Sequence, residues 1–84
     1  MRVEFLGIPR ERAGVAELEL DADTLGQLLA ALERKFPSLG ALMDSGRLHS
    51  SFLASLNGDT FVSDPLTRLS ESDCVLILSA DAGG

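Results

Sequence analysis

A single helix-forming segment dominates this chain, and the residues around it predict short strands. Between Thr24 and Pro37, apolar residues recur at the helical period. They form one stripe, made of Leu25, Leu28, Leu29, Leu32 and Phe36. Thr24 is a good N-cap, Gln27 follows at the capping-box spacing, and Pro37 ends the helix. A helix with one apolar stripe must bury it against a second layer, so the strands are expected to supply a sheet.

The segment before the helix predicts a hairpin. Residues 2–6 and 15–20 alternate between apolar and polar, as half-buried strands do. Residues 7–14 (GIPRERAG) join them, and Pro9 with glycines at both ends predicts a loop or wide turn. An antiparallel strand pair is therefore expected at the N-terminal end of the chain.

The segment after the helix predicts further strands. Residues 38–46 are expected to hold a short second turn of helix. Residues 52–56 are a strand candidate, and the Asn57-Gly58 pair that follows is the strongest short hairpin signal, which places a return strand at 60–62. Residues 75–79 (VLILS) are almost entirely apolar, which is typical of a central strand covered on both faces, or of one exposed to a partner.

Together these segments predict an α+β fold, with one main helix packed on one face of a mixed four- or five-stranded sheet. The first and last strands can pair in parallel, because the segment that contains the helix supplies the crossover. Residues 1–79 are expected to form the domain, and residues 80–84 a flexible tail.

Charge and composition exclude several classes of function. The net charge is −6, and the seven cations, of which Lys35 is the only lysine, form no basic stretch. Nucleic acid and anionic membranes are therefore poor partners, whereas a basic protein surface would suit an acidic chain. The sequence has no apolar run long enough for a membrane span and no signal peptide, so a cytoplasmic location is expected.

The side chains offer little for catalysis or metal binding. Cys74 is the single cysteine and His49 the single histidine, so neither a disulfide, a zinc site nor a catalytic triad is expected. The chain is therefore predicted to be a non-enzymatic protein without a stably bound cofactor or metal.

The chain ends in Gly83-Gly84, a few residues after the last predicted strand. Two residues without Cβ give a thin tail that ends in a carboxylate. We therefore expect the terminal carboxylate of Gly84 to be the functional group.

Four segments in this order resemble the MoaD/ThiS sulfur-carrier family, which has the ubiquitin-like β-grasp fold. They are Arg10-Glu11-Arg12-Ala13-Gly14 after the first strand, the Leu-rich helix ending in Phe36-Pro37, Leu56-Asn57-Gly58, and residues 73–78 (DCVLIL) followed by the diglycine end. The length favours the small subunit of molybdopterin synthase within this family. The tail, Ser79 to Gly84, lacks the two prolines that those subunits commonly carry, so carriers for cysteine, thiolated tRNA, thiazole or secondary metabolites stay open.

The resemblance implies a chemistry and partners. An adenylating enzyme of the ubiquitin-activating type would consume ATP to convert the Gly84 carboxylate to an acyl-adenylate. Sulfur would then displace AMP and leave a thiocarboxylate for a sulfur-accepting enzyme, such as the large subunit of molybdopterin synthase. Gly83, with Ala82 and Asp81 before it, would thread the narrow active site of the partner.

A carrier also needs a docking face. Because side chains alternate along a strand, Val3, Phe5, Val75 and Ile77 are expected to face the helix. Leu6, Leu76 and Leu78 would then form an exposed apolar patch on the opposite face, which is expected to dock the partner. The resemblance implies that residues at the Leu6 and Leu78 positions contact the larger synthase subunit or the activating enzyme. Two other functions stay open. The chain would be a ubiquitin-like modifier if Gly84 is conjugated to lysines of other proteins, or a non-covalent binding module if the tail is incidental.

Overall fold

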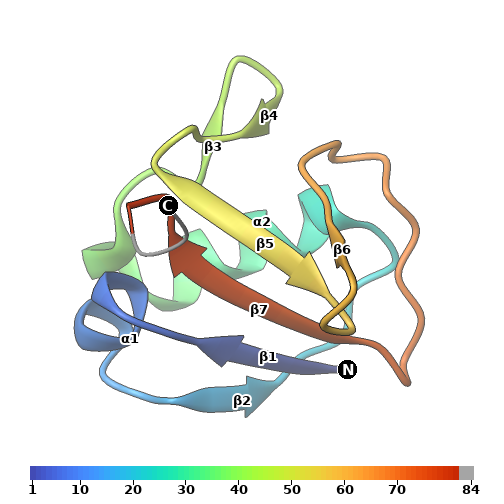
Figure 1. Cartoon of the computed structure of the whole chain (residues 1–84), viewed down its shortest axis with the longest axis horizontal. Helices are drawn as coiled ribbons and strands as arrows, with labels where there is room; N and C mark the ends of the chain where they lie inside the picture. The colour runs from blue at the N-terminus through green and yellow to red at the C-terminus, as the bar shows by residue number, and fades with distance from the viewer. Residues whose placement is uncertain (82–84) are drawn as a thin grey trace.

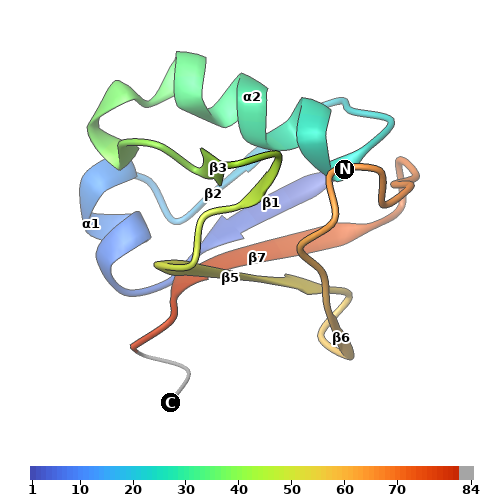
Figure 2. The same ribbon diagram turned by 90° about the horizontal axis from the view of Figure 1, so that it is seen from above.

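The computed structural model describes residues 1–81 and shows a five-stranded mixed sheet covered on one face by a helix (Figures 1 and 2). The sheet order is β2-β1-β7-β5-β6. The strands are β1 (Arg2–Phe5), β2 (Glu17–Glu19), β5 (Phe52–Leu56), β6 (Thr60–Phe61) and β7 (Cys74–Ser79). The chain therefore has the ubiquitin-like β-grasp fold predicted from the sequence.

The last strand, β7, is the central strand of the sheet. It pairs in parallel with β1, with Val3 opposite Val75, and antiparallel with β5, with Ala54 opposite Ile77. These four side chains are at most 1% exposed, because they lie between the sheet and the helix. The parallel pairing and the central place of the apolar last strand are both confirmed.

The main helix, α2 (Leu25–Lys35), crosses this inner face of the sheet (Figure 2). The four leucines of its apolar stripe are completely buried, and Phe36 is partly buried. Its N-terminus has a variant of the predicted capping box, in which the Gln27 side chain reaches back to Asp23, one residue before the N-cap. The Thr24 hydroxyl accepts from the Gln27 amide at 3.2 Å, and the Gln27 side-chain oxygen accepts from the Asp23 amide at 2.8 Å. The ring of Phe36, at the C-cap, contacts that of Phe5 edge-on, with centroids 5.7 Å apart.

The hairpin between β5 and β6 turns at Asn57 and Gly58, which both have positive φ (55° and 74°), and Asp59 completes the connection between the paired Leu56 and Thr60. The side chain of Asn57 also ties the turn to the start of β7. Its oxygen accepts from the Cys74 amide at 2.8 Å, and its nitrogen donates to Asp73 at 2.9 Å. The strongest short signal in the sequence therefore fixes both the hairpin and the position of the central strand.

The expected loop over residues 7–14 is wrong, because the structure has a short helix, α1 (Ile8–Ala13). Pro9 lies in the first turn, where no amide hydrogen is needed, and Gly14 ends the helix in the left-handed conformation with φ 78°. The glycine and proline that suggested a loop are in fact the start and stop signals of this helix.

Between α2 and β5 the structure has more than the expected turn of helix. The turn is the 3-10 helix η1 (Pro37–Leu39), and a hairpin of β3 (Met43–Asp44) and β4 (Arg47–Leu48) follows it. Ser45 and Gly46 form the turn of this hairpin, both with positive φ.

Candidate functional site: the outer face of the sheet and the end of β7

The chain stays in the sheet up to Ala80 and then turns away from α2 (Figure 2). Ser79 pairs with Phe52, and the Ala80 amide donates to the Ser51 carbonyl at 2.9 Å. Asp81 is exposed and is the last described residue. Gly84, the predicted reactive residue, and Ala82 and Gly83, which were predicted to thread the partner active site, lie outside the described residues.

The face of the sheet opposite α2 carries the predicted docking residues, and the structure confirms part of the predicted exposure. Leu6 is 47% exposed and Leu76 is half-buried. The Leu6 amide donates to the Ile77 carbonyl at 3.0 Å, which extends the β1–β7 pairing and places Leu6 beside the end of β7. The predicted division of the β1 and β7 side chains between the two faces of the sheet is right, since Phe5 and Ile77 are buried toward α2.

The expected exposure of Leu78 is wrong, because only 8% of this residue is accessible. Leu78 does not belong to the core cluster under α2, so it points to the outer face as the alternation requires. Its neighbours on that face are apolar, with Leu53 directly across on β5 and Leu6 beside it on the other flank. The helix α1 also contacts β7. Leu78 is therefore part of a small second apolar layer rather than an open patch.

Two residues of this outer face were missed by the sequence analysis. Leu53 lies opposite Leu78, and Phe61, on the edge strand β6, lies opposite Ser55 and is 67% exposed. Alternation along β5 would have placed Leu53 on this face. A two-residue turn at Asn57-Gly58 would instead have placed Phe61 opposite Ala54, and the additional residue Asp59 shifts the register so that Phe61 lies opposite Ser55.

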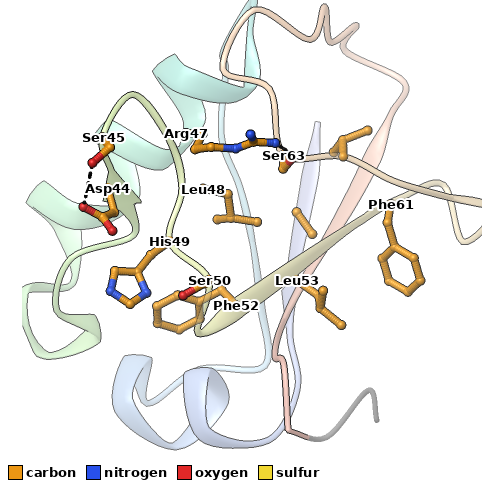
Figure 3. A pocket seen from close by; sticks show the side chains of 12 residues that line it. Asp44, Ser45, Arg47, Leu48, His49, Ser50, Phe52, Leu53, Phe61 and Ser63 are labelled. Carbon is orange, nitrogen blue, oxygen red and sulfur yellow. Dashed lines mark hydrogen bonds between the residues drawn. The ribbon is translucent and has the colours of Figure 1, made fainter.

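A groove of about 470 Å³ opens between the β3–β4 hairpin and strands β5 and β6 (Figure 3). Leu48, Phe52 and Val62 contribute apolar surface to it. At its rim the Arg47 guanidinium donates to the Ser63 hydroxyl at 3.1 Å. Its shape would accommodate an apolar side chain, and no residue of the predicted site lines it.

The other half of the outer face is polar. The thiol of Cys74 donates to the Glu4 carboxylate at 3.1 Å, and Arg2 lies 3.9 Å from Glu17. Burial raises the pKa of the Cys74 thiol, and the hydrogen bond to Glu4 raises it further. Cys74 therefore stays a protonated thiol at neutral pH, which does not suit a nucleophile.

Within residues 1–81, no group of His, Cys, Asp and Glu side chains is arranged to hold a metal ion. None of the helices in this range is long and apolar enough to cross a membrane.

The fold and the comparisons with known proteins place the chain in a class of small ubiquitin-like sulfur carriers and modifiers. More specifically, the sequence profile of the ThiS family matches residues 3–84, so the chain belongs to the ThiS family. A comparison with curated protein sequences found no match.

Solved structures agree with this assignment. CysO of Mycobacterium tuberculosis is 29% identical, with a TM-score of 0.79 over 94% of this chain and 97% of CysO. The small archaeal modifier protein 1 of Methanosarcina acetivorans is 26% identical, with a TM-score of 0.77 over 99% of this chain and 94% of that protein. A structure of the BexX/CysO complex of Amycolatopsis orientalis shares the fold at 24% identity, with a TM-score of 0.81 over 99% of this chain and 98% of the matched one.

Proposed function

We propose that this chain is a sulfur carrier whose Gly84 carboxylate is adenylated and then converted to a thiocarboxylate. The observation that supports the proposal most strongly is the placement of β7. The central strand of the sheet leads directly to Asp81, where the chain leaves the domain on the side away from α2 (Figure 2). Three residues of minimal bulk, Ala82, Gly83 and Gly84, remain beyond this point to reach a partner active site.

The chemistry follows from the weakness of a carboxylate as an acyl donor. An oxygen of the Gly84 carboxylate attacks the α-phosphorus of ATP, and pyrophosphate leaves. Hydrosulfide then attacks the carbonyl carbon of the acyl-adenylate, AMP leaves with the bonding electron pair, and the thiocarboxylate forms with loss of a proton. A protein persulfide can also deliver the sulfur, in which case a second thiol must cleave the S–S bond. Neither step needs a side chain of the carrier as acid or base.

The partners follow from the same chemistry. An adenylating enzyme of the ubiquitin-activating type supplies the ATP-dependent step, and a second enzyme accepts the sulfur. The large subunit of molybdopterin synthase is the first acceptor to test. Enzymes of cysteine, thiolated-tRNA or thiazole synthesis are the alternatives. Leu6 and the half-buried Leu76 give these partners an apolar contact close to the end of β7.

Mass spectrometry tests the proposal directly. The chain is incubated with ATP, sulfide and the adenylating enzyme of its source organism, and the terminal peptide is then weighed. The expected product has one oxygen replaced by sulfur at Gly84. A Gly84→Ala variant is the control, because a Cβ at that position should block entry to the active site while leaving the fold intact. Normal thiocarboxylation of this variant would contradict the threading argument.

A second candidate function is protein modification through Gly84, and the likeness to a small archaeal modifier protein favours it. Both functions share activation by adenylation but give different products. Isopeptide bonds between Gly84 and lysine side chains of other proteins, found in the source organism without any thiocarboxylate, would establish modification instead of sulfur transfer.

A further inference from the structure

The seven cations of this acidic chain are placed unevenly. Four of them lie on two elements at the end of the molecule where the chain leaves β7: Arg10, Arg12, Arg34 and Lys35. Helix α1 contacts both β7 and η1, and η1 follows directly after α2. Figures 1 and 2 show α1, the C-terminal end of α2 and the end of β7 at the same end of the molecule.

We call this region the basic end and define it as α1, the last turn of α2 (residues 32–35), η1 and residues 80–81. Three of the thirteen anions also lie there, namely Glu11, Glu33 and Asp81. The basic end therefore has a charge of +1, whereas the rest of the chain, with three cations and ten anions, has a charge of −7.

The four cations of the basic end are free to meet a partner. All four side chains are exposed, and within residues 1–81 none lies in an ion pair. Glu33 is half-buried, and its carboxylate accepts a hydrogen bond from the Leu42 amide at 2.8 Å, so it does not pair with these cations. Both helices carry these cations in their last turns, where the helix dipole favours positive charge, so the two helix ends together gather the cations in one region.

For a partner in contact with this region, the charges nearby matter more than the net charge of −6 of the whole chain. Salt screens charges over about 8 Å at physiological ionic strength. The six residues of β7 span roughly 17 Å, and the acidic residues Glu71 and Asp73 lie at its far end. A partner that takes up the chain end therefore meets the cations of α1, which contacts β7, at shorter range than Glu71 and Asp73. The charge of this region therefore favours a different partner surface from the one expected from the net charge.

We infer that the basic end docks on an acidic protein surface that surrounds the cleft of the adenylating enzyme. This inference rests on the proposed function, and it names the charge of the partner that performs the first step. A protein surface fits better than a phosphate group, because Arg10 and Arg12 are two residues apart on a helix and point to different sides. They cannot converge on one small anion, but a broad acidic rim can meet both.

The test is ATP–pyrophosphate exchange by the adenylating enzyme of the source organism, measured at several salt concentrations. The test variant carries Arg10→Glu and Arg12→Glu. The matched control carries Arg47→Glu and Arg68→Glu, which changes the net charge equally at two exposed sites outside the basic end. Thermal unfolding of both variants shows whether each is folded. If the charge reversal unfolds α1, the neutral pair Arg10→Gln and Arg12→Gln replaces it.

We expect kcat/KM for the test variant to fall about tenfold at low ionic strength and about threefold or less at high salt. The kcat/KM of the neutral variant should also fall, but by a smaller factor. The kcat/KM of the control variant should stay within about twofold of the wild-type value. An unchanged or faster test variant, or a control that falls equally, overturns the inference. Absence of exchange with the wild-type chain instead overturns the proposed function, and the inference with it.

Discussion

Replacing Asn57 by Ala should destabilise the domain more than any other single change at an exposed polar residue. Asn57 has φ 55°, and an alanine in this left-handed region costs about 1–2 kcal/mol. The substitution also removes the hydrogen bond from the Cys74 amide to the Asn57 side chain, which contributes about 1 kcal/mol. The bond to Asp73 lies at the surface and adds little. The expected loss of unfolding free energy is about 2–3 kcal/mol.

A matched variant separates the two contributions. Asn57→Gly tolerates positive φ but loses the same side-chain hydrogen bonds, so it should be about 1 kcal/mol more stable than Asn57→Ala. Urea unfolding followed by far-UV circular dichroism measures both, because the chain has no Trp or Tyr for fluorescence. With a slope of about 1 kcal/mol/M for a domain of this size, the alanine variant should unfold at about 2–3 M less urea. A decrease of the urea midpoint by less than about 0.5 M in the alanine variant would refute the reasoning. An equal loss of unfolding free energy in both variants would also refute it.

Four further outcomes are expected. Leu78→Glu should lower the unfolding free energy by about 2 kcal/mol or more in urea titrations, because it places a charge at a site that is 8% exposed. Leu6→Glu should change it by less than about 0.5 kcal/mol yet weaken binding of the adenylating enzyme in calorimetry; equal destabilisation by both would contradict the assigned burial. The hydrogen bond from Asn57 lowers the pKa of Asp73 in the folded state, so its stabilising effect is present above about pH 4 and is lost as the pH falls further. The unfolding free energy should therefore change less between pH 2 and 6 in the Asp73→Asn variant than in the wild type. An equal change in both proteins would refute this. Alkylation of Cys74 at pH 8 should be slower in the folded chain than in urea, because its pKa is raised by burial; equal rates would contradict this.

The features that could be predicted from the sequence are those that neighbouring residues determine. The capping box of α2 involves Thr24 and Gln27, three residues apart, and the β5–β6 turn needs only Asn57 and Gly58. The central place of β7 followed from its own apolar run. The parallel pairing of β1 with β7 followed from chain order alone, because a helix lies between them.

The remaining features depend on residues far apart in the sequence or on ambiguous signals. The burial of Leu78 depends on Leu53, 25 residues earlier, and on Leu6 at the other end of the chain. Pro9 and Gly14 are common both in loops and at the two ends of a short helix, so local composition could not separate these outcomes. The basic end exists only because folding brings α1 next to the end of α2.

The central place of β7 also has a consequence for synthesis on the ribosome. The strand that joins the two halves of the sheet is the last one of the domain to be translated, so β1 and β5 have no mutual partner before it emerges. Nascent or prematurely terminated polypeptides should therefore stay unfolded and open to proteolysis. Only a chain translated through residue 79 can complete the sheet, so resistance to proteolysis requires the strand that leads to the proposed functional carboxylate of Gly84.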